Sequence, residues 1–519
     1  MESHTPILVI GCGIAGCSAA LVAARSGHDV LMICSTNDPL ESNTSRAQGG
    51  VVTFGPGDSP ELLSKDIIEA GAGMCNPDAV RYLSENGPTL LKKFLVEDLH
   101  VPFDKAPTGE LDLTEEGAHS MPRILHAADL TGRAIIQTML DAVRAEPRIT
   151  LCTGLLAVDL LNLPDHSANR LDVYKPQRCV GAYVLEIATG KVKTITANQT
   201  ILATGGLGQI YLHSTNAKTA RGDGIALAYR AGARLLNLEY IQFHPTALYH
   251  PDANRFLISE AVRGEGGVLV NEDGQPFMQK YHPLESLAPR DVVARAIQNE
   301  MLESGSTCVY LDIAHKREAA WIRNRFPNIY ATCLKFGIDI SNQPIPVVPA
   351  AHYSCGGVAV DHVGNTSLPG LRAAGEVSCT GLHGGNRLAS TSLLEGMLWG
   401  WNSGLDSVRW LNENKLTIPS IRPFMVESEA VDPALIIQDS SHIKYTMWNY
   451  VGLTRTPRRL TRAMSILREL QHEILSFYRQ ARPSDPIIGL RNTITTALAV
   501  LFAAQRNKTS CGCHYVQED

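Results

Sequence analysis

A short apolar run at residues 7–10 leads directly into the sequence Gly-Cys-Gly-Ile-Ala-Gly at residues 11–16. A stretch rich in alanine and leucine at helical spacing follows, and then a second apolar run at residues 30–33. Strand, glycine turn, helix and strand in this order indicate a dinucleotide-binding unit. The first glycine permits the tight turn, the second lets a pyrophosphate approach the helix N-terminus, and the third lets helix and strand pack closely. The predicted contacts in this turn are Gly11, Cys12, Gly13, Ile14, Ala15 and Gly16.

The sequence after the second apolar run favours FAD over NAD. An acidic residue normally ends this strand and binds the ribose hydroxyls, but residues 34–37 read Cys-Ser-Thr-Asn, so the hydroxyl of Ser35 would take that role. Glycine-rich segments also return from distant sequence, at 44–50, 200–206 and 371–376. A nicotinamide cofactor would not need them, whereas an isoalloxazine ring has contacts of its own. The further predicted FAD contacts are Asn43, Thr44, Ser45, Arg46, Ala47, Gln48, Gly49, Gly50, Asp223, Glu376, Ser392 and Leu393.

The chain, at 519 residues, is too long for one hydrophobic core. The FAD-binding patterns lie in residues 1–236 and 353–419, which we predict to form one discontinuous, Rossmann-like α/β domain. We predict that residues 237–352 form an inserted α+β domain that caps the ring, with three prolines between 344 and 349 as the hinge. Residues 420–519 carry long amphipathic patterns and are predicted to form a C-terminal helical bundle.

Charge and composition exclude several classes of protein. The net charge of -6 argues against nucleic-acid binding, which needs a clustered basic face. No apolar run reaches the roughly 18 to 20 residues that cross a bilayer, and no basic segment precedes residues 7–10. We therefore expect a cytoplasmic protein that contacts no membrane.

The twelve cysteines are scattered along the chain, which indicates reduced thiols rather than a disulfide framework. Cys511 and Cys513 precede His514, but no second Cys-x-x-Cys pair completes a set of four ligands. We therefore predict no metal site.

The loop at residues 383–395, His-Gly-Gly-Asn-Arg-Leu-Ala-Ser-Thr-Ser-Leu-Leu-Glu, combines an arginine with a glycine- and serine-rich backbone. Arg387 in this loop indicates an anionic ligand. The glycine- and serine-rich backbone can approach a flat ring closely and form hydrogen bonds with it. This pairing indicates a flavin held against a carboxylate substrate.

Four further motifs resemble those of the succinate dehydrogenase and fumarate reductase flavoprotein superfamily. They are Gln-Phe-His-Pro-Thr at 242–246, Ser-Glu-Ala-Val-Arg-Gly-Glu-Gly at 259–266, Ala-Pro-Arg-Asp at 288–291 and Ala-His-Tyr-Ser-Cys-Gly-Gly at 351–357. Within this superfamily, Glu-Gly-Ala-His-Ser at 116–120 and Arg-Ile-Leu-His-Ala-Ala-Asp at 123–129 are similar to the L-aspartate oxidase family, the flavoenzymes of de novo NAD biosynthesis. The likeness runs from about Ile7 to His514 and so covers nearly the whole chain.

The resemblance implies a dicarboxylate clamp with donors aimed at both ends of the substrate. Arg387 would bind one carboxylate through two hydrogen bonds, with His352 beside it. His244 and the hydroxyl of Ser259 would hold the other carboxylate. Arg290 would lie near the reacting carbon, as an acid–base group or as an electrostatic stabiliser.

Departures from the superfamily pattern narrow the assignment. Dehydrogenases that attach FAD covalently carry a histidine where this chain has Asn43, so FAD is expected to bind noncovalently. Glu116 stands where the dehydrogenases have an uncharged amide, and an anion there would bind an ammonium group. Ser259 and Thr391 replace the more common threonine and asparagine. Cys511 stands where the family usually has an arginine, so the role of the C-terminus is open.

The implied reaction is the oxidation of L-aspartate to iminoaspartate by FAD, with O2 (giving H2O2) or fumarate as electron acceptor. Quinolinate synthase is the implied recipient of iminoaspartate, and a monomer or homodimer is expected. The alternative is a soluble fumarate reductase or succinate dehydrogenase flavoprotein. That alternative gains if Glu116 proves remote from the ring.

Overall fold

The computed structural model of the chain describes residues 2–128, 130–253, 255–415, 418–425 and 429–518. Within them the largest sheet has seven strands in the order β6-β2-β1-β9-β8-β7, with β16 also paired to β9. Its strands are β1 (Glu2–Ile10), β2 (Val30–Ile33), β6 (Ile149–Cys152), β7 (Leu155–Asn162), β8 (Cys179–Glu186), β9 (Lys191–Leu202) and β16 (Leu371–Ala373). β1, β2, β6, β9 and β16 pair in parallel, whereas β8 pairs antiparallel with both β7 and β9. The carboxyl ends of the parallel strands therefore meet at one edge, where the glycine turn follows β1.

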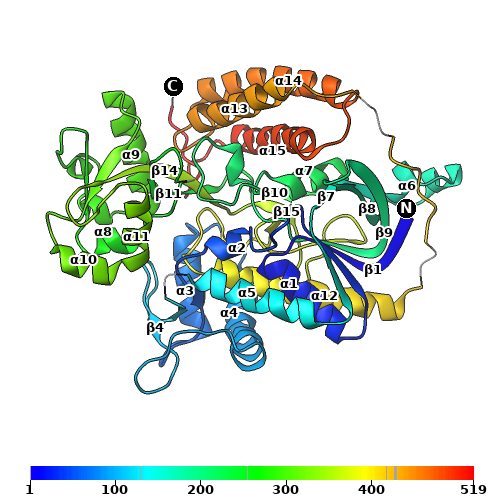
Figure 1. Cartoon of the computed structure of the whole chain (residues 1–519), viewed down its shortest axis with the longest axis horizontal. Helices are drawn as coiled ribbons and strands as arrows, with labels where there is room; N and C mark the ends of the chain where they lie inside the picture. The colour runs from blue at the N-terminus through cyan, green and yellow to red at the C-terminus, as the bar shows by residue number, and fades with distance from the viewer. Residues whose placement is uncertain (1, 129, 254, 416–417, 426–428, 519) are drawn as a thin grey trace.

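One face of this sheet is covered by α1 (Ile14–Arg25), α5 (Thr131–Ala145) and α12 (Ser392–Glu413), which lie side by side in Figure 1. Small residues let α1 and α12 approach closely. A Cβ at Gly400 would lie 2.3 Å from the carbonyl oxygen of Ala15, and one at Gly404 would lie 2.5 Å from that of Ala19. The loop at residues 383–391, which precedes α12, is thereby fixed against the glycine turn that precedes α1.

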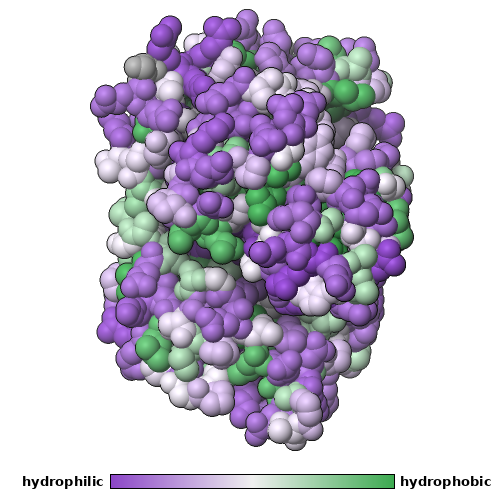
Figure 2. All heavy atoms as spheres, turned by 90° about the vertical axis from the view of Figure 1, so that its left-hand side faces the viewer, coloured by the Kyte–Doolittle hydropathy of each residue, from purple (hydrophilic) through white to green (hydrophobic). Residues whose placement is uncertain are grey.

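The chain leaves this domain after β10 (Leu235–Leu236) and returns at β15 (Gly357–Ala359), which pairs with β10. In between, β11 (Ile241–Leu248), β14 (Ile345–Ser354), β13 (Val309–Asp312) and β12 (Val268–Val270) form a separate antiparallel sheet. The helices of this unit are α8 (Glu260–Gly264), α9 (Arg290–Ser304), α10 (Ala319–Arg325) and α11 (Pro327–Lys335). The unit has its own apolar core and forms the left-hand part of Figure 1. Figure 2 shows this side of the molecule as mainly hydrophilic, with small separate apolar areas.

The prediction of a proline hinge is wrong. Pro346 and Pro349 lie inside β14, where the apolar sequence around them is buried between β11 and β13. Pro349 falls where the pairing with β11 is irregular, between His244 and Ala247. Proline is tolerated at such an irregularity because no ladder hydrogen bond is lost there.

The C-terminal part contains α13 (Pro433–Tyr450), α14 (Pro457–Tyr478) and α15 (Asp485–Arg506), which pack together along the upper side of Figure 1. Proline occupies the first position of α13 and α14, and the side chains of Asp432 and Thr456 cap them. α15 is long and apolar enough to cross a membrane by length and composition, although the sequence predicted no such segment. However, 78% of its apolar window is buried inside the protein, as in a core helix.

The loop that contains Glu116 is carried by a small sheet of β3 (Val51–Val52), β5 (Ile124–Leu125) and β4 (Leu113–Thr114). Asp129, the last residue of the 123–129 motif, lies outside the described residues. The remaining elements are α2 (Asn43–Arg46), α3 (Pro60–Ala70), α4 (Pro77–Leu91), α6 (Leu163–His166), α7 (Asp223–Arg230) and β17 (Ser378–Cys379).

Candidate active site

A cavity of about 1190 Å³ lies between the carboxyl edge of the parallel strands and the β11–β14 sheet. Every residue predicted to bind the substrate lines this cavity, and so does every predicted FAD contact except Gly16. Sites for one small ligand have volumes of about 300 to 1,000 Å³. The cavity is therefore large enough for a cofactor and a substrate together.

The glycine turn has the geometry expected of a phosphate-binding loop. Gly11 has φ +118°, and a Cβ there would lie 2.1 Å from the carbonyl oxygen of Ala203. The hydroxyl of Thr44 accepts a hydrogen bond from the backbone N–H of Ile14 at 3.1 Å, which ties this turn to α2. Gly16 does not line the cavity. A Cβ on Gly16 would lie 2.1 Å from the carbonyl oxygen of Gly11, so this glycine lets α1 pack on the turn instead.

Glu376 and Asn43 form a hydrogen-bonded pair on the cofactor side of the cavity. One carboxylate oxygen of Glu376 accepts from Asn43 Nδ2 at 2.8 Å, and the other accepts from the backbone N–H of Ser354 at 3.1 Å. Burial raises the pKa of Glu376 to about 7, even though both hydrogen bonds lower it. Asn43 Oδ1 accepts from the backbone N–H of Ala217 at 2.8 Å. Both ends of the Asn43 amide are therefore bound to the protein.

Two further predicted positions, and Thr391 beside them, are engaged by neighbouring side chains or by the loop. The carboxylate of Asp223 accepts from Arg221 and Asn492. The hydroxyl of Ser392 accepts from Arg387 Nη1 at 3.1 Å. The hydroxyl of Thr391 donates to the carbonyl oxygen of Leu388 at 2.7 Å and is fully buried, so its contact is with the loop.

Arg387 is a buried cation in the loop that precedes α12. Its side chain lies over the ring of Tyr353, 4.9 Å from the centroid, and its Nε donates to Gln242 Oε1 at 3.2 Å. Burial, followed by the charge of Arg290, lowers the pKa of Arg387. Among the residues that the structure describes, no Asp or Glu forms an ion pair with it. A buried charge of this kind is stabilised by an anionic ligand.

Arg290 begins α9 and is paired with a carboxylate. Its Nε donates to Glu260 Oε2 at 2.5 Å, and Arg263 Nη2 lies 3.7 Å from the same oxygen. Burial lowers the pKa of Arg290, but Glu260 and, less strongly, Glu116 outweigh that effect and leave it raised. Glu260 was not predicted as a functional residue. It lies in the recognised 259–266 motif, but the motif alone did not point to this carboxylate.

The two predicted histidines lie with their ring centroids 5.5 Å apart. His244 Nδ1 accepts from the backbone N–H of Thr246 at 3.2 Å, so the neutral ring carries its proton on Nε2. His352 Nδ1 lies 2.9 Å from the hydroxyl of Thr215. Burial and neighbouring arginines lower the pKa of both rings well below the ordinary value, which leaves them neutral.

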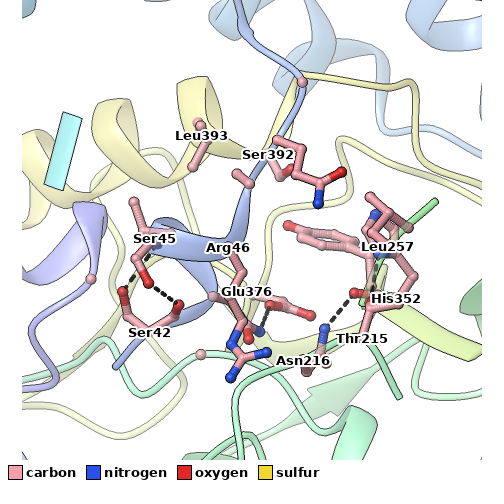
Figure 3. Close-up of a pocket in the computed structure, with 18 of the residues that line it drawn as sticks. Ser42, Ser45, Arg46, Thr215, Asn216, Leu257, His352, Glu376, Ser392 and Leu393 are labelled. Carbon is pink, nitrogen blue, oxygen red and sulfur yellow. Dashed lines mark hydrogen bonds between the residues drawn. The ribbon is translucent and has the colours of Figure 1, made fainter. Parts of the chain in front are cut away.

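In Figure 3, His352 lies on one side of the cavity, next to Thr215 and Asn216, which both form hydrogen bonds with it. Ser42 and Ser45 lie on the opposite side of this view, and Glu376 lies between the two groups. Segments far apart in the sequence therefore meet around one space.

Glu116 lies against the backbone of the predicted FAD site. Its Oε2 accepts from the hydroxyl of Ser390 at 2.6 Å, and that hydroxyl accepts from the N–H of Gly50 at 3.2 Å. A Cβ on Gly49 would lie 2.5 Å from Glu116 Oε1. Ser390 was not predicted as a site residue. Its φ of +58° is strained for any residue other than glycine. Glu116 therefore lies between residues 43–50, predicted to bind FAD, and the loop of Arg387, predicted to bind the substrate.

Ser259 lines the cavity at the start of α8. Its hydroxyl accepts from the backbone N–H of Ala261 at 3.3 Å and so caps this short helix. The hydroxyl proton is left to donate to a ligand in the cavity.

Residues 6–393 match a family model described as an FAD binding domain. The chain is 44% identical to L-aspartate oxidase 1 of Ralstonia nicotianae, over 99% of this chain and 95% of that protein. It is 43% identical to the L-aspartate oxidase of Pseudomonas aeruginosa (98% and 94% covered) and 39% identical to the chloroplastic one of Arabidopsis thaliana (98% and 80%).

Two solved structures share the fold at lower identity. A mutant of the Escherichia coli quinol fumarate reductase superposes with a TM-score of 0.87 and 27% identity, over 100% of this chain and 92% of that one. Mycobacterium smegmatis Sdh1 gives a TM-score of 0.85 and 28% identity, over 99% and 89%. The oxidases are thus more similar in sequence than these two redox proteins.

Proposed function

Since the chain belongs to the L-aspartate oxidase family and carries out the FAD-dependent oxidation of L-aspartate, we propose how the residues around the cavity divide the substrate between them. The reaction yields iminoaspartate and is the first step of de novo NAD biosynthesis. The observation that carries the proposal is the charge pattern of the cavity. The carboxylate of Glu116, held by Ser390, lines the same cavity as Arg290 and Arg387, which suits a substrate with two negative groups and one positive group.

Arg387 binds one carboxylate of L-aspartate. A guanidinium has five N–H donors, and here one goes to Gln242 and one to Ser392. The remaining donors suit a two-bond contact with a carboxylate. His352, held by Thr215, lies beside this end of the substrate.

His244 and Ser259 bind the second carboxylate. The Nε2–H of His244 is free to donate because its Nδ1 is already an acceptor. Hydrogen bonds to charged groups contribute roughly 1.5 to 3 kcal/mol each. Two neutral donors are sufficient here, because the arginines already supply the positive charge.

Glu116 binds the α-ammonium group. The hydrogen bond from Ser390 fixes one carboxylate oxygen and leaves the other, Oε1, available to the substrate. A succinate or fumarate molecule has no positive group to pair with this carboxylate. We infer that Glu116 accounts for the preference for aspartate.

The residues of the cofactor side fit FAD. Gly205 has φ +75° and no atom within 4 Å of the position of a Cβ, so bare backbone faces the cavity. The turn at 11–15 suits the pyrophosphate, Ser35 suits the adenosine ribose, and residues 43–50 with Glu376 suit the ribityl and isoalloxazine groups. Asn43 cannot form the histidyl bond, so FAD binds noncovalently. Bound FAD supplies the hydride acceptor for the α-carbon of aspartate.

Arg290 stabilises charge near the reacting carbon. Its pairing with Glu260 keeps the guanidinium protonated, which favours the electrostatic role over that of a base. The β11–β14 unit acts as the cap that positions Arg290 and excludes water from the ring.

Electrons leave to dioxygen, which gives H2O2, or to fumarate, which fits the same clamp. We infer that iminoaspartate, which hydrolyses readily, passes to quinolinate synthase, and that the enzyme works as a monomer or homodimer. A cytoplasmic location fits the cysteines, because all twelve are described and unpaired.

Glu116→Gln tests the proposal. It should reduce kcat/KM for L-aspartate by about ten- to a hundredfold and leave fumarate reduction within about twofold, because only the ammonium contact is lost. Steady-state kinetics of the two half-reactions with a common redox dye measure this. Equal losses in both would remove Glu116 from ammonium recognition.

A further inference from the structure

The C-terminal segment, residues 510–517, folds back onto the active-site loop and is anchored by a buried arginine. Arg455 is 0% exposed, and its Nη1 lies 2.5 Å from His514 Nδ1. The backbone N–H of Arg455 donates to Tyr515 at 3.1 Å, and that of Gln517 donates back to Arg455 at 2.8 Å. Burial and Arg455 lower the pKa of His514 to about 4, so the neutral ring accepts through Nδ1 and donates through Nε2 to Asn507.

The same segment also contacts the capping unit. The guanidinium of Arg295 lies over the ring of Tyr515, 4.5 Å from the centroid. Arg295 belongs to α9, the helix that begins with Arg290. In Figure 1 the red C-terminal segment runs between α9 and the ends of α13 and α15. The segment therefore packs against both the loop that contains Arg387 and the helix that begins with Arg290.

Cys513 makes two contacts with the loop of Arg387. Its backbone N–H donates to Gly385 at 2.8 Å, and its thiol donates to Asn386 Oδ1 at 3.1 Å. A Cβ on Gly512 would lie 2.2 Å from the carbonyl oxygen of Gly385, so the two backbones are in close contact. The thiol is thus held at the residue that precedes the substrate-binding arginine.

Gln242 connects Asn386 with the guanidinium of Arg387 through hydrogen bonds. Gln242 is 2% exposed, and its Nε2 donates to Asn386 Oδ1 at 2.6 Å and to the carbonyl oxygen of Arg387 at 2.9 Å. Its Oε1 accepts from Arg387 Nε at 3.2 Å. Only one orientation of this amide satisfies all three contacts, because both acceptors must face Nε2.

The thiol of Cys513 fixes the orientation of the next amide. The thiol donates to Oδ1 of Asn386, which also accepts from Gln242 Nε2, so two donors hold this amide with its oxygen directed at this point. Without the thiol, Asn386 Oδ1 keeps one of these two hydrogen bonds, and the amide is held less firmly against Gln242. Gln242 would then lose its fixed orientation toward Arg387.

We propose that Cys513 is a positioning residue for substrate binding, which acts on Arg387 through Asn386 and Gln242. The inference rests on the proposed role of Arg387 as the anchor for a substrate carboxylate. It gives a role to a cysteine motif that the oxidation chemistry does not use.

The test compares Cys513→Ala with Cys511→Ala as a matched control on the same segment. The thiol of Cys511 donates to the carbonyl oxygen of Ala72 at 3.8 Å, whereas that of Cys513 donates to Asn386. We expect Cys513→Ala to raise KM for L-aspartate, and Kd for succinate measured by flavin absorbance, about three- to tenfold at unchanged kcat. Cys511→Ala should change neither, and Cys513→Ser should restore both values to within about twofold.

A double-mutant cycle separates positioning from general destabilisation. Asn386→Ala should raise KM to the same extent, and adding Cys513→Ala to it should produce no further rise, because both act on one contact. Additive increases, an unchanged KM in Cys513→Ala, or equal effects in Cys511→Ala would overturn the inference. If Cys513→Ala does not fold, KM for L-aspartate is compared between Asn386→Ala and Cys513→Ser. A raised KM in the first and a near-normal KM in the second support the inference, and any other pattern overturns it.

Arg387→Leu distinguishes a failure of this inference from a failure of the proposed function. Loss of succinate binding in Arg387→Leu, together with normal binding in Cys513→Ala, would sink the role of Cys513 alone. Normal binding in Arg387→Leu would sink the proposed anchor and, with it, the role of Cys513.

Discussion

The cavity has two walls that are built in different ways. The cofactor wall, residues 11–15 and 43–50, presents mainly backbone and small side chains. The substrate wall presents long or polar side chains from separate elements; its members are Glu116, His244, Ser259, Arg290, His352 and Arg387. The first wall depends on a backbone conformation at Gly11 that only glycine adopts easily. The second depends on side-chain pairs that can be broken one at a time.

The two walls also differ in the substitutions that they tolerate. A methyl group added at Gly11 or Gly50 has no space, because a carbonyl oxygen lies 2.1 Å from the first Cβ position and another lies 2.2 Å from the second. A side chain removed from the substrate wall leaves the fold intact and removes one contact to the substrate. Variants of the two walls should therefore fail in different ways.

The largest expected effect is in the cofactor wall. Gly11→Val should yield protein that binds no FAD and has no activity, because φ +118° and the contact with Ala203 exclude a branched side chain. Flavin absorbance of the purified protein measures this. If the variant retained FAD, the turn would not be the pyrophosphate site.

Arg290→Leu should give the next largest effect and the opposite pattern. The variant should keep its FAD but lose activity by about a hundred- to a thousandfold or more, because a preorganised charge near the reacting carbon is removed. Flavin content and kcat are compared on the same preparation. Activity near that of the unmodified protein would show that Arg290 does not act on the reaction.

Ser390→Ala should give the smallest effect of the three. Glu116 would keep its charge but lose the hydrogen bond that fixes it, so KM for L-aspartate should rise about three- to tenfold while fumarate reduction stays unchanged. The ratio of the two activities is the measurement. A parallel change in both would mean that Ser390 serves the flavin side and not Glu116.

The sequence predicted the strand, glycine turn and helix beside the cofactor wall correctly because their signal is local. A strand, three glycines and a helix within one short stretch specify the turn, and the position of Gly11 follows from that pattern alone. The substrate wall was found through recognised motifs and through one departure from them, Glu116. Composition and periodicity alone would not have brought Arg290 and Arg387 to one cavity.

The residues that were missed act through others. Ser390 and Glu116 are 274 positions apart, and Gln242 and Arg387 are 145 apart, so no local pattern links them. Glu260 lies in the recognised 259–266 motif, but its pairing with Arg290, 30 positions away, is not visible in the sequence. Pro346 and Pro349 were assigned to a hinge because the burial of the surrounding strand was not visible in the sequence.

The most direct test of the account is an anaerobic mixture of the purified, FAD-containing protein with L-aspartate. The cavity is proposed to place the α-carbon of an amino dicarboxylate against the flavin, so the visible flavin absorbance should bleach with L-aspartate and not with succinate. Bleaching by succinate, without bleaching by L-aspartate, would contradict the assignment of Glu116 and of the whole substrate wall.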